Sequence, residues 1–193
     1  MQEDTKVSFP AFFTRGRAKR DKRMLIAQIG ITWLNIQHQR GAGGAVMIDI
    51  DDTLIDGREC VANGFEHMFK LYDVAFDLFP IHIVTARPDD TRTVVMQLLK
   101  KKKYFIPVDR LHMLPRDQYG KDPKYQYVER FKWQAYRKIG KMHGGVVARF
   151  GDKSWDVLHI ERLSNSHVED KDTYLCLDPK LEGTASFKLP GSE

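Results

Sequence analysis

The stretch AVMIDIDDTLIDG, residues 45–57, decides the fold of this 193-residue chain. Ala45–Ile50 is apolar and rich in β-branched residues apart from one aspartate, a pattern typical of a strand buried in a parallel sheet. The two-residue period of a strand points Asp49 and Asp51 to the same side and Asp52 away. Two adjacent carboxylates repel unless a cation neutralises them or one holds a proton. The stretch therefore predicts acid–base or metal chemistry at a strand end; the alternative is a turn capped by Asp51 and Asp52.

The sequence on either side alternates between the helical and the strand period. Apolar residues three or four apart predict a helix over Met24–Gln37, which Gly41–Gly44 end. Further on we expect helices over Cys60–Tyr72, Asp89–Lys102 and Glu129–Met142, strands over Ile81–Thr85, Leu111–Leu114, Gly145–Phe150 and Thr173–Leu177, and a last stretch, Leu181 to Glu193, that packs as a strand or frays. This alternation predicts an α/β fold, a doubly wound (Rossmann-like) parallel sheet of about five strands with helices on both faces.

Length and composition indicate one globular domain. With 42% hydrophobic and 30% charged residues, the chain can bury one core but not two full-sized ones, and its composition excludes disorder except at the ends. We expect one domain over residues 23–193, after a flexible basic segment over residues 1–22. The start shows no secretory signal, and we expect no membrane contact and a cytoplasmic location, with the nucleus as the alternative. Cys60 and Cys176 lack the spacing of a zinc site.

The net charge of +5 is concentrated in two clusters. Basic residues crowd residues 15–23 and Lys100–Lys103. The first cluster is typical of a nucleic-acid contact or a nuclear-import signal, and the alternative is an ordinary solvated helix face. Lys100–Lys103 suit the negative end of a helix dipole. The seven histidines show no metal-ligand spacing, so we expect structural or surface roles for them.

The second predicted strand brings a hydroxyl to the edge where ligands bind such sheets. Thr85 ends this strand, and Ala86 and Arg87 follow it. We expect these three residues to contact the substrate, since a hydroxyl can hold a phosphate oxygen. The alternative for Thr85 is a helix cap or turn residue.

The fourth predicted strand adds two more carboxylates. Asp152 and Asp156 follow it four residues apart, so they share one face if a helix begins there. Together with Asp49 and Asp51 they predict four converging carboxylates, the hard oxygen ligands that suit Mg²⁺. Helix capping is the alternative for the later pair. Lys132, near the start of the preceding helix, can reach the same edge or remain solvated.

In this order the residues resemble the haloacid dehalogenase superfamily, in its phosphatase branch. The resemblance is carried by DIDDT at 49–53, a strand ending in Thr85, Lys132, and GDKSWD at 151–156. FKWQAYRKI, before GDKSWD, and the closing FKLPG are similar to acid-phosphatase-like members, subfamily III.

The resemblance implies catalytic roles. Asp49 would be the nucleophile that forms an aspartyl-phosphate, and Asp51 would protonate the leaving oxygen and then activate water. Thr85 and Lys132 would hold the phosphoryl oxygens, where charge accumulates in the transition state.

The resemblance also implies a Mg²⁺ site. Asp49, the backbone carbonyl of Asp51, and Asp152 would bind the metal, with Asp156 either a direct ligand or a support for one. Lys153 departs from a purely acidic motif, since a cation there can pair with an aspartate and reduce its role in metal binding.

The spacing leaves no room for a cap domain, either between Asp51 and Thr85 or between Thr85 and Lys132. An open site admits nucleotides, nucleic-acid ends or phosphoproteins, shielded at most by loops or by another subunit of an oligomer. The sequence therefore predicts a Mg²⁺-dependent phosphomonoester hydrolase. The alternatives are a catalytically silent module that binds phosphate or nucleic acid, and a phosphotransferase that passes the phosphoryl group to another alcohol.

Overall fold

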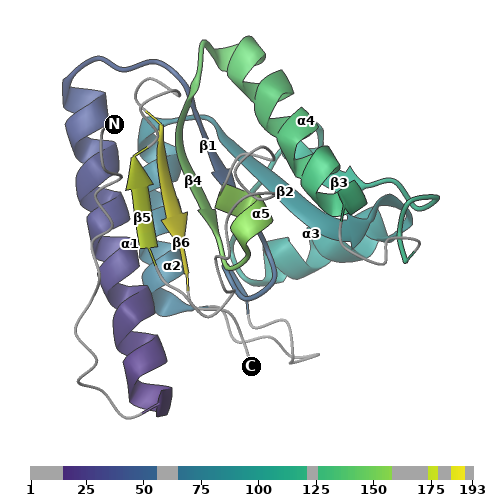
Figure 1. Cartoon of the computed structure of the whole chain (residues 1–193), viewed down its shortest axis with the longest axis horizontal. Helices are drawn as coiled ribbons and strands as arrows, with labels where there is room; N and C mark the ends of the chain where they lie inside the picture. Colours follow the sequence, from purple (N-terminus) through teal and green to yellow (C-terminus); the bar gives the residue numbers. More distant parts are fainter. Residues whose placement is uncertain (1–14, 56–64, 121–125, 158–173, 178–183, 190–193) are drawn as a thin grey trace, which may run out of the picture.

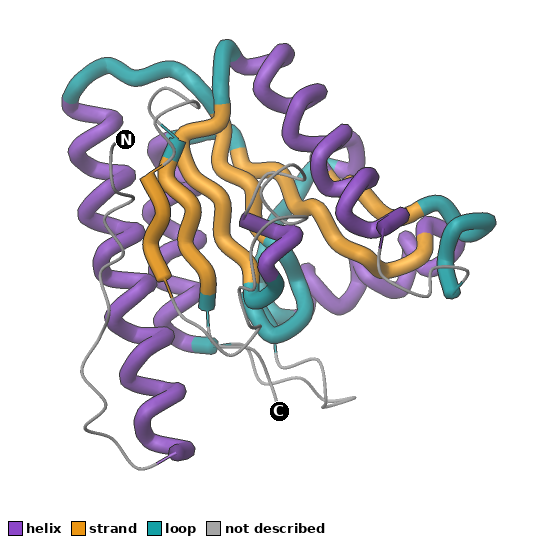
Figure 2. Tube along the Cα trace, viewed as in Figure 1, coloured by secondary structure: helices purple, strands orange, loops and turns teal. Residues whose placement is uncertain are grey.

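The computed structural model describes residues 15–55, 65–120, 126–157, 174–177 and 184–189. The helices are α1 (Arg15–Gln39), α2 (Glu66–Leu78), α3 (Arg92–Lys101), α4 (Gln126–His143) and α5 (Ser154–Val157), with short 3₁₀ turns η1 (Asp89–Thr91) and η2 (Val108–Arg110). The strands are β1 (Ala45–Ile48), β2 (Ile81–Pro88), β3 (Leu111–Leu114), β4 (Val146–Gly151), β5 (Tyr174–Leu177) and β6 (Ala185–Lys188). These strands form one sheet with helices around it (Figures 1 and 2).

The strand order in the sheet is β3-β2-β1-β4-β6-β5. β1 pairs in parallel with β2 and β4, β2 with β3, and β4 with β6. This confirms the predicted doubly wound parallel sheet. One strand differs from the expectation of a wholly parallel sheet. β5, which corresponds to the strand predicted over Thr173–Leu177, lies at the edge and runs antiparallel to β6. The fifth parallel strand is β6, in the stretch that was expected to pack as a strand or fray.

The two faces of the sheet are covered by different helices. On one face, Ala135 and Ile139 of α4 pack with Ala45, Met47 and Val84 of the sheet. On the other face, α1, α2 and α3 contribute apolar side chains to a larger core with the remaining strand residues. Among the residues described here no cap domain appears, as the sequence predicted.

A glycine lets α1 approach the sheet closely. A Cβ added at Gly30 would lie 2.7 Å from both Leu71 of α2 and Phe150 of β4. Leu71 and Phe150 are fully buried in the core, so neither side chain can move aside without disturbing the packing around it. Gly30 thus lets one helix pack against a second helix and the sheet at once.

The boundaries of α1 and α2 differ most from the sequence expectation. α1 begins at Arg15, so it includes residues 15–22 of the segment expected to be flexible. α2 begins at Glu66 and ends at Leu78, later than the expected Cys60–Tyr72; residues 60–64 lie outside the described part. None of the helices within the described ranges is long and apolar enough to cross a bilayer.

Three histidines that are far apart in the sequence meet at the carboxyl end of α4. His82 Nδ1 lies 2.9 Å from His112 Nε2, and His82 Nε2 lies 2.8 Å from His143 Nε2. We call these residues the histidine chain. His82 contacts one neighbour through each of its ring nitrogens, so the three rings form a chain and do not surround a common point. Within the described residues, the group of three side chains that could hold a metal ion consists of aspartates. The expected structural role of these histidines fits this arrangement, although no pattern in the sequence indicates that they touch.

Candidate active site

The loop after β1 places Asp49 at the carboxyl edge of the sheet. The Asp49 amide donates a hydrogen bond to the Phe150 carbonyl of β4 at 2.9 Å. The Ile50 carbonyl then accepts bonds from the amides of Leu54 and Ile55 at 2.9 and 3.1 Å, which closes a tight turn. Asp52 takes a positive φ of 56° in this turn, a conformation that aspartate tolerates better than most residues. Asp49 is therefore held rigidly and is buried.

Lys132 of α4 lies at the centre of the site. Its Nζ is 2.5 Å from Asp49 Oδ1 and 2.6 Å from Asp156 Oδ1, and it donates a third bond to the Val84 carbonyl at 2.6 Å. The side chain is only 4% exposed. The structure thus places Lys132 at the predicted edge of the sheet and excludes a solvated lysine, because three acceptors surround its buried ammonium group.

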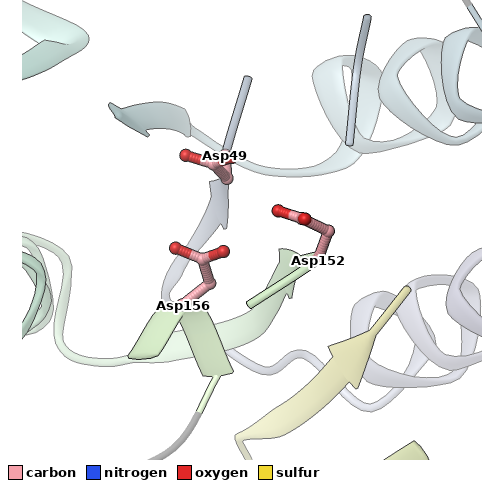
Figure 3. Close-up of side chains that lie close together, drawn as sticks. All are labelled: Asp49, Asp152 and Asp156. Atoms are coloured by element: carbon pink, nitrogen blue, oxygen red, sulfur yellow. The ribbon is translucent and has the colours of Figure 1, made fainter. Parts of the chain in front are cut away.

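The end of β4 supplies the remaining carboxylates. Asp152 and Asp156 are both buried, and their oxygens come within 4.8 Å of each other and of Asp49 (Figure 3). Gly151 makes room for this arrangement, since a Cβ there would lie 2.1 Å from the Asp156 Cβ. The Lys153 amide donates to Asp156 Oδ2 at 3.1 Å, and the Lys153 ammonium lies 3.4 Å from Asp152 Oδ2, so the expected pairing of Lys153 with an aspartate is present.

The electrostatics of the group follow from burial and proximity. Burial raises the pKa of Asp49 well above its usual value; Lys132 opposes this, and the neighbouring aspartates add to it. Burial, with the charge of Asp156, raises the pKa of Asp152 to about 7. Burial alone would lower the pKa of Lys132, but Asp156 and Asp49 together outweigh it and raise that pKa. One ammonium group therefore does not fully compensate three buried acids.

These residues fit a divalent metal ion. Three carboxylates can each offer an oxygen to one ion, and Mg²⁺ prefers such hard ligands. Asp152 Oδ2 is buried, and its contact with the Lys153 ammonium group, at 3.4 Å, is long. A buried carboxylate oxygen is costly unless it is well compensated, and a divalent cation would compensate it more closely. Asp49, Asp152 and Asp156 are thus the side chains that could hold the metal.

Asp51 does not join this group. The sequence predicted four converging carboxylates, but the Asp51 side chain turns instead to Arg87. The reason is that β1 ends at Ile48, so the strand period no longer determines the direction of residue 51. Arg87 Nε donates to Asp51 Oδ2 at 2.9 Å and Nη2 to Oδ1 at 2.6 Å.

The strand predicted to end at Thr85 continues to Pro88, and its second half carries the other predicted substrate contacts. Thr85 is fully buried, and its hydroxyl accepts a hydrogen bond from the Arg87 amide at 3.2 Å. It directly follows Val84, whose carbonyl accepts a hydrogen bond from Lys132. Ala86 and Arg87 are half-buried. Their contacts with substrate stay predictions.

A comparison with solved structures supports this architecture. The chain is similar in structure to the class C acid phosphatase from Bacillus anthracis, with a TM-score of 0.51 and 15% identity. The match covers 74% of this chain and 66% of that one, just under two thirds of the phosphatase's length. No protein-family model matches the sequence, and no curated protein matches it. At this identity the likeness shows the fold alone.

Most of this site is predictable from the sequence, and two contacts are not. The sequence predicts that Asp49, Lys132, Asp152 and Asp156 come together, and the structure places them in mutual contact or proximity. The double hydrogen bond between Arg87 and Asp51 and the histidine chain are visible only in the structure. Neither has a local sequence signal, because the partners are 30 or more residues apart.

Proposed function

We propose that this protein is a Mg²⁺-dependent phosphomonoester hydrolase that works through an aspartyl-phosphate intermediate. One observation carries the proposal: three buried carboxylates and a buried ammonium group meet at the carboxyl edge of a parallel sheet. A phosphate ester with a bound divalent cation complements both charges. The fold likeness to an acid phosphatase supports the same conclusion.

The first step would transfer the phosphoryl group to Asp49. A carboxylate oxygen of Asp49 attacks phosphorus, and the bond from phosphorus to the leaving oxygen breaks. Asp51 gives a proton to that oxygen, so the alcohol leaves neutral. Lys132 offsets the negative charge on the transferring oxygens, with Thr85 as a second donor beside it.

The second step would return Asp49 to its starting state. Water attacks the phosphorus of the aspartyl-phosphate, and Asp51 accepts a proton from the water. The bond between phosphorus and Asp49 breaks, which releases inorganic phosphate. Mg²⁺, held by Asp49, Asp152 and Asp156 together with the Asp51 carbonyl, would supply Lewis-acid polarisation and neutralise the buried acids.

The test is phosphate release from nucleoside monophosphates, a 3′-phosphorylated oligonucleotide, a phosphopeptide and an aryl phosphate, with Mg²⁺ or with a chelator. We expect release that requires Mg²⁺ and falls about 10³-fold or more in Asp49→Asn, because the nucleophile is lost. Asp77→Asn, an exposed carboxylate on α2, is the matched control and should keep full activity. An unfolding curve checks that both variants are folded.

Three outcomes contradict the proposal or redirect it. An unchanged rate in pure Asp49→Asn protein refutes the nucleophile. Binding of phosphate compounds without any release points to the silent binding module, whose other expected ligand is nucleic acid at the basic amino-terminal residues. A phosphorylated alcohol formed when an acceptor is added identifies a phosphotransferase.

A further inference from the structure

An interruption in β2 presents Arg87 to the active site. Thr85 of β2 pairs with Met113 of β3, and the next pair joins Pro88 with Leu114. β2 therefore carries two extra residues between consecutive partners. Such bulges redirect side chains and are common beside active sites. The backbone is thus built to aim Arg87 away from the regular strand direction.

Arg87 uses this position to hold both oxygens of Asp51. The two hydrogen bonds, at 2.9 and 2.6 Å, form the parallel fork that guanidinium groups make with carboxylates. The side chains of Arg87 and Asp51 are 27% and 40% exposed, whereas Asp49 is buried. The pair therefore stands on the open side of the site, and Asp49 lies at its base.

This fork conflicts with the proposed role of Asp51. To protonate a leaving oxygen, one carboxylate oxygen of Asp51 must face the substrate. In the structure both oxygens face the Arg87 guanidinium group instead. Asp51 can act only after Arg87 has moved, and a guanidinium group moves readily when a second anion accepts its hydrogen bonds. Phosphate matches the guanidinium fork as well as carboxylate does.

We propose that Arg87 recognises a second phosphate group on the leaving-group side of the substrate, and that binding this group draws Arg87 off Asp51. The inference rests on the proposed function. The favoured substrates are then phosphate monoesters whose leaving group carries another phosphate. A nucleoside 3′,5′-bisphosphate and a 3′-phosphorylated nucleic-acid strand both have this chemistry.

The geometry favours the leaving-group side over the transferred phosphoryl group. Lys132 already faces the place of the phosphoryl group beside Asp49, while Arg87 contacts the residue that would serve the leaving oxygen. The nearby Arg116 is less suited, because its guanidinium group pairs with Asp90 at 3.5 Å. Its backbone amide is also bonded to an aspartate, at 2.9 Å.

The first experiment measures binding without turnover. In Asp49→Asn protein, calorimetry compares a nucleoside 3′,5′-bisphosphate with the nucleoside 3′-phosphate, which lacks the second phosphate. We expect the bisphosphate to bind about 10- to 100-fold more tightly, the range of a charge-assisted hydrogen-bonded contact. Adding Arg87→Met should abolish this preference, and Arg87→Lys should keep part of it. Arg116→Met is the matched control and should preserve it.

The second experiment measures the same preference in turnover. The ratio of kcat/KM for the two compounds should fall toward one in Arg87→Met, and a 3′-phosphorylated dinucleotide shows whether a phosphodiester serves as the second phosphate. Equal binding of bisphosphate and monophosphate to the protein that retains Arg87 overturns the inference, as does a preference that survives in Arg87→Met. Arg87-dependent binding without any turnover refutes the proposed hydrolase and supports the recognition of a second phosphate by Arg87. Turnover without a preference for the bisphosphate supports the hydrolase and refutes this recognition.

Discussion

Mild acid should destabilise this protein through the histidine chain. His82 is 1% exposed, and burial lowers its pKa to about 4, with His112, His143 and Arg110 acting in the same direction and Asp109 against them. In the neutral form, His82 can donate through one ring nitrogen and accept through the other, which suits its two neighbours. A protonated ring could donate at both nitrogens, but it would bring a charge into a buried place beside Arg110.

The size of the effect follows from the two pKa values. A histidine whose pKa is lowered on folding adds stability above its unfolded pKa of about 6.5, and this contribution is lost as the pH falls toward the folded value. At about 1.4 kcal/mol per pKa unit, the loss is about 1 kcal/mol at pH 6 and about 2 kcal/mol at pH 5. The limit below pH 4 is about 3 kcal/mol. Burial also lowers the pKa of His112, so His112 likewise loses stabilising free energy as the pH falls.

Urea unfolding at a series of pH values between 5 and 8 measures this loss. His82→Gln removes the titrating group and keeps a polar side chain at the same place. The free energy of unfolding of the wild type should fall by about 2 kcal/mol more than that of His82→Gln between pH 8 and pH 5. His38→Gln, at an exposed histidine of α1, is the matched control and should follow the wild type.

A pH-independent difference between the two proteins would contradict this prediction. If the difference in unfolding free energy between wild type and His82→Gln stays constant from pH 8 to pH 5, His82 does not titrate differently in the two states. A constant deficit in the variant would then measure lost packing and hydrogen bonds only.

Two further predictions concern the carboxylates. Gly151→Ala should push Asp156 aside and reduce Mg²⁺-dependent turnover about 10²-fold, as misplaced catalytic groups do. Gly43→Ala, where the added Cβ would meet only the His143 carbonyl at an ordinary 4.0 Å, should have no effect, and equal rates in both variants would contradict the close contact at Gly151. Lys132→Met should lower kcat by about 10²-fold or more, because it removes the ammonium group at the centre of the site. The control Lys138→Met, at an exposed position on the same helix, should leave kcat unchanged. A normal kcat in Lys132→Met would exclude this lysine from the proposed chemistry.

The sequence predicted the parallel sheet because buried parallel strands are apolar along their whole length. Ala45–Ile48 and Val146–Gly151 are buried at every position, so the pattern and the structure agree. The direction of the strand at Tyr174–Leu177 could not be predicted, because an apolar run of four residues indicates burial but not orientation. Its antiparallel pairing depends on β6, which follows it in the chain.

The site was predictable where it depends on topology. Asp49 and Asp152 come directly after parallel neighbouring strands, and the carboxyl ends of such strands meet at one edge. The roles of these residues in catalysis stay predictions. The contact of Arg87 with Asp51 was not predictable, because it depends on a bulge in β2 and on the early end of β1. A period assigned to a strand fails once the strand has ended.

The last strand of the described chain lies inside the sheet. β6 pairs with β4 on one side and with β5 on the other, and the Leu189 amide donates to the Gly151 carbonyl at 2.8 Å, next to Asp152. During synthesis, every acid of the site therefore leaves the ribosome before the strand that supports them. Until Lys188 has been made, a growing chain can hold all the residues for catalysis while β4 still has an unpaired edge. The order of translation thus delays the finished site until β6 has been made.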